Sequence, residues 1–537
     1  MAIEKFGIFI AYPPTTDLRK EGLGHYLVSF LKGGSNIENV RFVVVCSSWI
    51  KEAIIELCVA NQLDPDSFDL VCPQKMPVVL RLYFKIVNYK TKRARNRSRF
   101  RPFKFISQRY MSILNRIESL FLTVESFLLL ILFSPLVLVF FIHYLGKFST
   151  TFVSQSVKFF LKKIGLLLPK GILQKALNML RNPKGSNIVL RSFNTMNAKQ
   201  TNKLVQLCEQ QKDVKAWYSP TAFWPEFNQI KKPSLMCVPD VVLAEFPIGF
   251  AQSGGMRFTQ AFRNVENSIL SAKHVVCYSE HIKQGTLIER YGFNEDRVNV
   301  VRHAPLDLSP HIPSRNGRKL GEDQLFSLSV LNDIISRGMT DVGYKSKSLD
   351  QLDYIFYASQ FRPNKNVITL LSAYRRLIES GETQSKLILS GNKNAFPSVQ
   401  EYIKNADLEN QVLCVPGLEM HELAILFENA RLAINPSLSE GGAPFTFTEA
   451  LSVGTPIVMA RIPVTLEVIS NPSLDDRMFF DPYSVDDLAK VLLYGLENSK
   501  ELLELQQPVF NKLSLRTWRM VVEEHIQVLR NISEPIQ

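Results

Sequence analysis

The stretch NPSLSEGGAPFTFTEALSVGTPIV occupies residues 435–458 and follows a short apolar run, Ala433–Ile434. It passes a pair of glycines and two glutamates and leads into a further apolar run, Pro456–Met459. Short apolar runs bounded by glycine and proline are typical of strands that are buried on both faces. Such strands occur in parallel sheets, where the loops that follow the strands bind ligands. The stretch therefore indicates a parallel α/β fold with a ligand site.

Apolar runs of the same kind recur on both sides of this stretch, separated by segments with helical patterns. Alternating strands and helices are typical of a doubly wound parallel sheet. In the second half of the chain we expect strands at Tyr354–Ala358, Lys386–Ser390, Val412–Val415, Ala433–Ile434 and Pro456–Met459, then helices around Val485–Leu496 and Trp518–Arg530. In the first half we expect strands at Phe6–Ala11, Phe42–Cys46, Asn187–Leu190, Leu235–Val238 and His274–Tyr278.

A chain of 537 residues is long enough for two domains. The composition excludes a collagenous, coiled-coil or wholly disordered chain. The seven cysteines form no Cys-x-x-Cys pair, which argues against a zinc ribbon or a disulfide framework and favours a reducing compartment. The sequence thus predicts an α/β protein with two Rossmann-like, doubly wound domains that face each other across a cleft.

Two cations follow the first strand of the second series. Arg362 and Lys365 lie between the strand Tyr354–Ala358 and a helical pattern that begins at Val367. Cations beside a helix N-terminus are well placed to neutralise a diphosphate. An exposed loop with ordinary basic residues is the alternative explanation when this loop is taken alone.

The later loop adds carboxylates to these cations. Glu440 and Glu449 can accept hydrogen bonds from vicinal hydroxyl groups, and the glycines at 441 and 442 allow the backbone to approach a ligand closely. For Glu449 the alternative is an acid that stabilises a helix N-terminus. Cations for a diphosphate and acids for sugar hydroxyls together predict a nucleotide-sugar site.

In their order along the chain, these segments resemble the second domain of the retaining GT-B glycosyltransferases of family four, which include sucrose-synthase-like and mannosyltransferase-like enzymes. The resemblance runs from about Tyr354 to Trp518. It rests on Arg-x-x-Lys-Asn after the first strand, Gly391, Val415-Pro-Gly417 with its helix, the Pro-Ser-x-x-Glu-Gly loop, Glu-Ala-Leu-x-x-Gly-Thr-Pro and Glu467. The first domain matches more thinly, at Gly22-Leu-Gly24, which resembles the family's glycine loop, and at Val238-Pro-Asp240, Ser279-Glu-His-Ile-Lys283 and Tyr291-Gly292.

The resemblance implies roles for particular residues. Arg362 and Lys365 would hold the donor diphosphate and stabilise the leaving nucleotide. Glu440 would contact the transferred sugar, and Asp240 would be a further catalytic residue. No convincing Asp-x-Asp follows a strand, so we expect neither a metal nor a cofactor beyond the nucleotide-sugar donor. The other implied donor-binding residues are Gly22, Gly24, Gly391, Val415, Gly417, Gly441, Gly442, Ala443 and Glu449.

Two features depart from the family pattern. Glu440 and Glu449 enclose eight residues where the family usually has seven, and Pro239 stands where the family often has a histidine. Both support a rival hypothesis, a catalytically inactive glycosyltransferase fold that serves as a membrane-bound assembly subunit or a glycan-binding module. The intact Arg362, Lys365 and glycine loop argue against it. The histidines available in the first domain, which as lone histidines are more often structural or exposed, are His25, His281 and His303.

Basic residues are concentrated in one part of the chain. Residues 70–208 contain 24 lysines and arginines but only two acids, whereas the rest contains 39 basic and 48 acidic residues. Within this block a basic run precedes an apolar segment, Phe127–Ile142, which is the composition of an attachment site on an anionic membrane leaflet. A solvated face or a nucleic-acid site is the alternative, but the apolar segment has no use in a phosphate groove. The run comprises Lys90, Lys92, Arg93, Arg95, Arg97, Arg99, Arg101 and Lys104.

The apolar segment is short for a membrane span. A spanning helix needs ~20 mostly apolar residues. The strands before and after the block are expected in one sheet, so a single crossing would place parts of one domain on opposite sides of the bilayer. The only partner for a second span, Thr151–Leu168, has lysines opposite its apolar arc and resembles an in-plane amphipathic helix. We therefore expect a monotopic or re-entrant insertion, with a helical hairpin as the alternative.

These expectations combine into one organisation. We expect an acceptor-side N-terminal domain in residues 1–80 and 186–309, interrupted by a membrane-associating insertion at 81–185. An interdomain connection at 310–352 should lead to a nucleotide-sugar-binding domain at 353–515. The last residues, 516–537, should form a C-terminal helix that packs back on the first domain. The predicted function is hexose transfer, with mannose favoured, from GDP-mannose or a UDP-sugar to a lipid-linked or membrane-borne glycan in polysaccharide or glycolipid biosynthesis. The predicted location is the cytoplasmic face of the membrane, and no nucleic-acid partner is expected.

Overall fold

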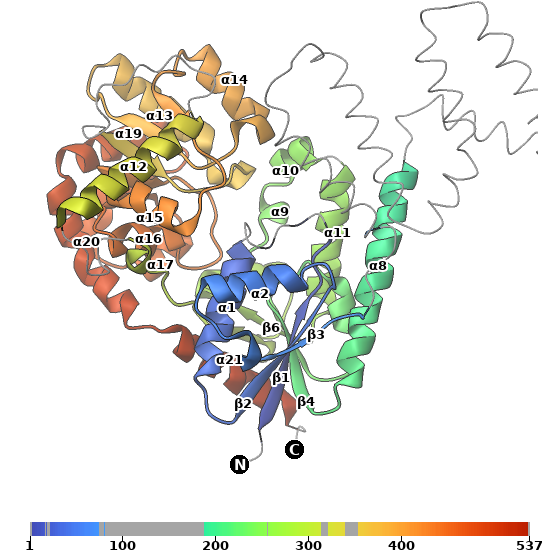
Figure 1. Cartoon of the computed structure of the whole chain (residues 1–537). Helices are drawn as coiled ribbons and strands as arrows, with labels where there is room; N and C mark the ends of the chain where they lie inside the picture. Colours follow the sequence, from blue (N-terminus) through green and yellow to red (C-terminus); the bar gives the residue numbers. More distant parts are fainter. Residues whose placement is uncertain are drawn as a thin grey trace, which may run out of the picture.

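The computed structural model of the chain describes residues 3–14, 16, 18, 22–74, 80, 187–254, 256–312, 320–338 and 353–534. The expected insertion at 81–185, with its basic run and its two apolar segments, lies outside the described residues. None of the described helices is long and apolar enough to cross a lipid bilayer. The described chain forms two parallel sheets, each covered by helices on both faces (Figure 1).

The first sheet has seven parallel strands in the order β3-β2-β1-β4-β5-β6-β7. Most residues of its central strands are buried, as expected for strands covered on both faces. The strands are β1 (Glu4–Ile10), β2 (Val40–Cys46), β3 (Asp69–Val71), β4 (Val214–Ser219), β5 (Ser234–Cys237), β6 (His274–Cys277) and β7 (Val298–Val300). The helices of this domain are α1 (Gly22–Ser35), α2 (Lys51–Ala60), α8 (Asn187–Gln210), α9 (Val242–Glu245), α10 (Pro247–Gly254), α11 (Met256–Ser271) and the π-helix η6 (Ile282–Arg290).

The second sheet has six parallel strands in the order β10-β9-β8-β11-β12-β13, the same winding about a central strand as in the first sheet. The strands are β8 (Tyr354–Tyr357), β9 (Lys386–Leu389), β10 (Val412–Cys414), β11 (Leu432–Asn435), β12 (Ile457–Ala460) and β13 (Phe479–Phe480). The helices are α12 (Leu320–Gly338), α13 (Val367–Glu379), α14 (Pro397–Asn405), α15 (Met420–Glu428), α16 (Phe445–Ser452), α17 (Pro463–Val468), α18 (Asp475–Met478), α19 (Val485–Glu497) and α20 (Ser499–Ser514).

The last helix, α21 (Trp518–Ser533), leaves the second domain and packs on α1 and β4 of the first. Figure 1 shows this red helix beneath the blue and green elements, with both chain ends close together. Two glycines of α1 permit the close approach, because a Cβ atom on Gly33 would lie 2.6 Å from the Trp518 carbonyl oxygen. The buried side chains of α21 belong to the first hydrophobic core, not to the second.

Three expectations from the sequence are wrong in detail. Asn187–Leu190 is the first turn of α8, not a strand, and the strand beside β1 is instead β4. Residues 310–352 are not simply a connection, because α12 lies among them and buries Leu331, Ile334 and Ile335 in the second core. Gly22 and Gly24 belong to the first turn of α1, not to a loop.

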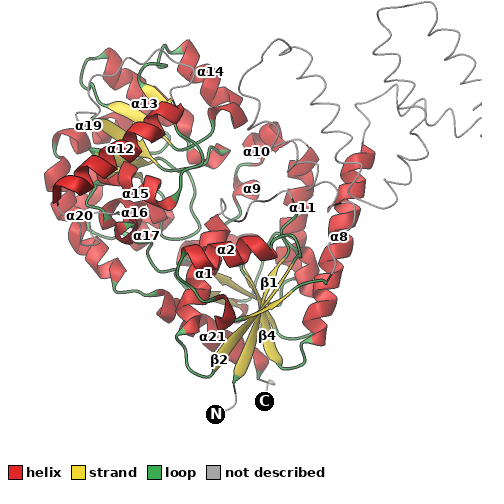
Figure 2. Ribbon diagram, in the orientation of Figure 1, coloured by secondary structure: helices red, strands yellow, loops and turns green. Residues whose placement is uncertain are grey.

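Figure 2 shows loops, in green, on the sides of the two domains that face each other. In the second domain these loops follow β8, β11, β12 and β13, and in the first domain they follow β5 and β6. In a parallel sheet all carboxyl ends lie at one edge, so each domain gathers its polar loops on one side. The two edges face each other, and contacts between them are described below.

Candidate active site

The loop after β8 and the loop after β11 form one unit. Lys365 Nζ donates a hydrogen bond to Glu440 Oε1 at 2.6 Å, and the two side chains are 21% and 19% exposed. The backbones are also joined, since Leu438 N donates to the Asn364 carbonyl oxygen at 2.8 Å. A further contact runs from Tyr357 Oη to the Lys365 carbonyl oxygen at 3.2 Å. The cation and the carboxylate predicted from separate motifs are therefore partners in an ion pair.

Asn366 positions these cations at the start of α13. Its φ of 53° is left-handed, a conformation that asparagine tolerates better than most residues. Its side chain donates to the Pro482 carbonyl oxygen at 2.7 Å and accepts from Thr369 Oγ1 at 2.7 Å. The turn formed by Pro363–Lys365 thus ends directly at the helix N-terminus, where backbone N–H groups and the helix dipole favour an anion.

The glycine loop after β11 touches the first domain. A Cβ atom on Gly441 would lie 1.6 Å from the Pro239 carbonyl oxygen, and one on Gly442 would lie 2.6 Å from Tyr278 Cβ. Ser279 Oγ also donates to the Gly441 carbonyl oxygen at 3.0 Å. Glycine is required at both positions because the backbone of one domain meets the other there. Ala443, the next residue, lies close to the imidazole of His303.

Asp240 completes the cluster from the first domain. The pKa of its carboxyl group is raised to about 6, first by burial and then by the charge of Glu440, while Lys365 and Arg362 act in the opposite direction. Burial lowers the pKa of Lys365, but Glu440, Tyr357 and Asp240 together raise it above its ordinary value. All four residues predicted as catalytic therefore lie within electrostatic reach of one another, and Lys365 is protonated at neutral pH.

Glu449 lies in α16 and is only 9% exposed. Burial raises the pKa of its carboxyl group to about 7. Within the part of the chain that the structure describes, no residue donates a hydrogen bond to this carboxylate. A carboxyl group held in such surroundings is stabilised in its charged form when hydroxyl groups donate to it.

The remaining predicted donor residues lie in both domains and in different surroundings. Gly391 follows β9 and faces the Phe361 ring, since a Cβ atom there would lie 2.1 Å from the ring carbons. Val415 and Gly417 follow β10, where Val415 is buried and Gly417 has a φ of +78°. Gly24 makes its close contact with the Leu18 carbonyl oxygen, inside the first domain, and Gly22 makes no such contact. These contacts do not join Gly22 and Gly24 to the Lys365–Glu440 pair.

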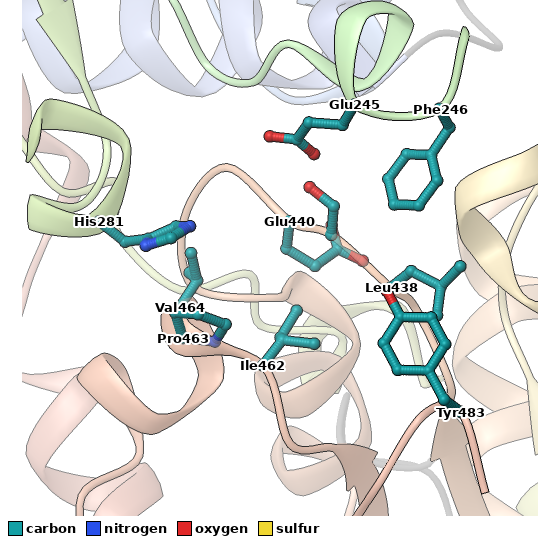
Figure 3. Close-up of a pocket in the computed structure, with 10 residues that line it drawn as sticks. Glu245, Phe246, His281, Leu438, Glu440, Ile462, Pro463, Val464 and Tyr483 are labelled. Carbon is teal, nitrogen blue, oxygen red and sulfur yellow. The ribbon is translucent and has the colours of Figure 1, made fainter. Parts of the chain in front are cut away.

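A cavity of about 330 Å³ lies between the domains. Figure 3 shows Glu245 and Phe246 of the first domain facing Glu440 of the second, with Tyr483 beside Leu438 and with His281 beside Val464. Sequence reasoning did not assign Glu245, Phe246 or Tyr483 to the site. Glu245 lies five residues after Asp240, in the segment that follows the same strand, so its position could have indicated a site residue. No motif marks Tyr483. The complete lining is Glu245, Phe246, His281, Leu438, Ser439, Glu440, Ile462, Pro463, Val464 and Tyr483.

Glu467 of α17 makes a second contact between the domains. Its carboxylate accepts hydrogen bonds from Glu280 N at 3.0 Å and His281 N at 3.1 Å, at the start of η6 in the first domain. Arg302 Nη2 donates to the same carboxylate at 2.9 Å. A carboxylate that accepts bonds from the first N–H groups of a helix stabilises both the helix and the contact. His281, considered above as a lone histidine, is therefore placed at the cavity by its backbone.

His303 is buried and its pKa is lowered to about 4, mainly by burial. It is neutral at physiological pH and packs against Phe445, with 4.2 Å between the ring centroids. It supports the glycine loop through packing and contributes no charge to the site.

The fold and the site together define a class, a two-domain glycosyltransferase fold of the GT-B type. Residues 344–508 match the family model described as glycosyl transferases group 1. The resemblance found in the motifs is thereby confirmed for the C-terminal domain, which contains Arg362, Lys365, Glu440 and Glu449.

One curated relative is the O-antigen chain mannosyltransferase RfbU of Salmonella typhimurium, which is 28% identical over 113 residues. The aligned part covers 21% of this chain and 31% of the relative. The chain therefore aligns with about a third of that protein.

Solved structures show the same two-domain fold. A glycosyltransferase from Rickettsia africae is 11% identical, with a TM-score of 0.52, 99% of this chain covered and 100% of that chain. The Anabaena HepE protein in complex with UDP and glucose is 12% identical, with a TM-score of 0.53 and coverages of 98% and 100%. Sucrose-phosphate synthase from Thermosynechococcus elongatus is 10% identical, with a TM-score of 0.54 and coverages of 98% and 99%. The expectation of two facing Rossmann-like domains is confirmed.

Proposed function

We propose that this protein is a retaining glycosyltransferase that transfers a hexose from a nucleotide sugar to a lipid-linked or membrane-borne glycan. The observation that carries the proposal is the Lys365–Glu440 ion pair, which lies at the junction of two strand-end loops and within reach of Arg362 and Asp240. A cation pair for a diphosphate and carboxylates for sugar hydroxyls meet there. The match of residues 344–508 to glycosyl transferases group 1 supports the same assignment.

In the proposed reaction the bond between the anomeric carbon and the diphosphate oxygen breaks, and a bond from that carbon to the acceptor oxygen forms. The acceptor hydroxyl proton passes to the departing phosphate oxygen, and the nucleoside diphosphate leaves. Negative charge grows on the leaving oxygen, where Arg362, Lys365 and the N-terminus of α13 oppose it. These groups take the part that a metal ion plays in other transferases, so the proposed reaction requires neither metal nor cofactor.

The carboxylates orient the donor in this scheme. Glu440 accepts hydrogen bonds from the hydroxyls of the transferred sugar, and the backbone amides of Gly441, Gly442 and Ala443 bind its hydroxyls or the phosphate. Glu449 accepts hydrogen bonds from the ribose hydroxyls. That role would favour the charged form of Glu449 when the donor is bound, because donated hydrogen bonds stabilise a carboxylate.

GDP-mannose is the first donor candidate. The similarity to the O-antigen chain mannosyltransferase supports mannose, although that alignment covers a limited part of both proteins. UDP-glucose and UDP-N-acetylglucosamine are the next candidates.

The acceptor and the location are inferred from the basic and apolar block alone. We propose that residues 81–185 hold the protein on the anionic cytoplasmic face of a membrane and bring it to a membrane-borne acceptor. Deletion of residues 90–168 should abolish sedimentation with liposomes that contain an anionic lipid. Retained sedimentation and retained activity on a lipid acceptor would contradict this part of the proposal.

The experiment that tests the function measures nucleotide release by the detergent-solubilised protein from GDP-, UDP- and ADP-sugars, with and without a membrane lipid extract. Release from one donor should be stimulated by lipid. Lys365→Ala and Glu440→Ala should each reduce it about 10²- to 10³-fold, as for the loss of one group that stabilises a transition-state charge. Arg375→Ala is the matched control, because Arg375 lies on the exposed face of α13 and pairs with Glu379. Absence of release from every donor, with a nucleotide still bound, would favour the inactive-subunit hypothesis.

A further inference from the structure

The cavity between the domains adjoins the proposed donor site without coinciding with it. Of the residues assigned to the donor, only Glu440 lines the cavity. Arg362, Lys365 and Glu449 do not. If Glu440 contacts the transferred sugar, as proposed above, the rest of the cavity adjoins that sugar, and an acceptor must approach the sugar from a neighbouring space.

One wall of the cavity is an aromatic ring that contributes little to the fold. Tyr483 is 76% exposed. Its backbone is fixed, because its N–H donates to Asp481 Oδ1 at 2.9 Å and the preceding Pro482 carbonyl accepts from Asn366 Nδ2 at 2.7 Å. A turn of this kind is satisfied by small polar residues and does not need an aromatic side chain. An exposed tyrosine on a fixed turn suits a ligand-binding surface, because a tyrosine offers a large apolar face at low entropic cost.

The opposite wall comes from the first domain. Glu245 and Phe246 lie at the end of α9, in the segment that follows β5, and Figure 3 shows both directed toward Glu440. The cavity lining therefore contains carboxylates from two domains and two aromatic rings. Carboxylates accept hydrogen bonds from hydroxyl groups, and aromatic faces pack against C–H surfaces. A pyranose ring presents hydroxyls at its edge and C–H groups on its faces, and so matches both kinds of group.

We propose that this cavity binds a sugar residue of the acceptor, with its C–H face on Tyr483 and with a hydroxyl donating to Glu245. The proposal rests on the transferase function proposed above and specifies its acceptor as a carbohydrate at the reacting end. A purely apolar occupant such as a lipid chain fits less well, because it would remove the carboxylates of Glu245 and Glu440 from water without supplying hydrogen-bond donors. A volume of about 330 Å³ is at the small end of the range for ligand pockets, about 300–1,000 Å³.

The test uses saturation-transfer NMR on the full-length protein. The probes are the methyl α-glycosides of mannose, glucose and N-acetylglucosamine, with octanoate as an apolar probe, each measured with GDP or UDP present. At least one glycoside should bind the wild type and Tyr483→Phe. Its affinity should fall about five- to tenfold in Tyr483→Ala and in Glu245→Gln, as for the loss of one aromatic contact or one hydrogen bond. Leu515→Ala, which shortens a 76% exposed side chain that does not line the cavity, should bind like the wild type.

A failure of the acceptor subsite can be distinguished from a failure of the proposed transferase function. The thermal midpoint of each sample is recorded with and without the nucleotide. If a nucleotide stabilises the protein but no glycoside binds, or if glycoside binding is unchanged in Tyr483→Ala, the acceptor subsite is wrong and the transferase proposal stands. Binding of octanoate alone, lost in Tyr483→Ala, would likewise overturn the sugar assignment. If no nucleotide binds, both proposals fail.

Discussion

Lys365 and Glu440 are the residues around which the site is organised. Both side chains are mostly buried, so neither charge is fully solvated, and each compensates the other. Removal of one partner from such a pair leaves the other charge uncompensated, which costs more than the pair itself contributes. The pair also lies close to Asp240, whose raised pKa reflects burial first and the charge of Glu440 second. The site therefore holds its carboxylates close together, and a bound diphosphate would meet cations that are already oriented.

The buried carboxyl group of Glu449 makes stability depend on pH. Its pKa is raised from 4.5 to about 7 by burial, so between these pH values the folded protein keeps a proton that the unfolded chain has lost. Wild-type stability should fall as pH rises through this range. Glu449→Gln removes the ionisable group and with it this decrease in stability. At pH 8 the variant should therefore have a higher thermal midpoint than the wild type, and its free energy of unfolding should be greater by at most about 3 kcal/mol. At pH 4 the substitution should have little effect. Calorimetry at the two pH values measures the difference.

Glu379→Gln provides the control for Glu449→Gln, because Glu379 lies on the surface of α13 and is 60% exposed. It should show no comparable gain at pH 8. If Glu449→Gln were no more stable than the wild type at pH 8, the carboxyl group would not be held in apolar surroundings.

The glycine loop after β11 and the segment after β5 pack so closely that position 441 cannot accommodate a side chain. A Cβ atom on Gly441 would lie 1.6 Å from the Pro239 carbonyl oxygen, so Gly441→Ala must displace one of the two segments. A displacement of about 1 Å at a catalytic centre can cost about 100-fold in rate. We expect nucleotide release to fall by that order. Gly285→Ala is the matched control, because its Cβ atom would meet its nearest neighbour at 3.8 Å. Equal activity of both variants would contradict the close contact.

The contact between α17 and η6 holds the domains together at a second point. Glu467→Ala removes the acceptor for Glu280 N and His281 N and leaves Arg302 without this partner. Loss of such a helix-terminal carboxylate costs about 1 kcal/mol. Hydrogen exchange at these two amides should therefore accelerate about fivefold. Glu295→Ala, which breaks an exposed ion pair with Lys283 inside the first domain, should leave them unchanged. Unaltered exchange in Glu467→Ala would show that the carboxylate does not hold the helix.

Several elements could be predicted from the sequence because their pattern is unambiguous. The strands of the second sheet are short apolar runs between turns, and the loops after them contain recognisable motifs. The run Asn187–Leu190 was misassigned because four residues with three apolar side chains suit a buried strand and a helix turn equally. β4 was missed because its sequence, VKAWYS, mixes a lysine and bulky aromatics and has no long apolar run.

The clustering of the candidate site residues was predictable where a motif also follows a strand. Arg362, Lys365, Glu440 and Asp240 follow strands, and the carboxyl ends of parallel strands converge. Tyr483 was not predictable, because its place at the cavity depends on how Asn366 and Asp481 fix a turn that no sequence pattern marks. Gly22 and Gly24 were misplaced because the helix α1 begins earlier than its apolar pattern.

At the scale of the whole molecule, the chain crosses between the domains twice and ends in the first. Residues of α21 fill the first core, and Arg530 near the C-terminus donates to Glu4 near the N-terminus, with its Nε at 2.9 Å from Glu4 Oε2. The last helix is thus part of the first domain, although it follows the second along the chain. The two domains are joined by the two crossing segments of the chain and by the Gly441 and Glu467 contacts.

The packing of α21 in the first core predicts that substitutions in α21 destabilise the first domain, and tryptophan fluorescence can measure this effect. All four tryptophans, at 49, 217, 224 and 518, lie in or against the first core, so tryptophan fluorescence reports on that domain. Ile526→Ala removes a side chain that is 2% exposed and should destabilise the first domain by about 2–5 kcal/mol in urea titrations followed by fluorescence. Met520→Ala, at a 43% exposed position of the same helix, is the control and should have little effect. If Ile526→Ala left the fluorescence transition unchanged, α21 would not belong to the first core.

On the proposed function, the second domain holds a nucleoside diphosphate at Lys365 and Glu449. Calorimetric titration of GDP, UDP and ADP into the full-length protein tests it most directly, because binding does not require the acceptor. We expect one of the three to bind the wild type and Arg375→Ala equally, and to bind Lys365→Ala at least about tenfold more weakly, as for the loss of one charge-assisted hydrogen bond. If none of the three nucleotides binds, or if Lys365→Ala and Glu449→Gln leave the affinity unchanged, the proposed nucleotide site is wrong.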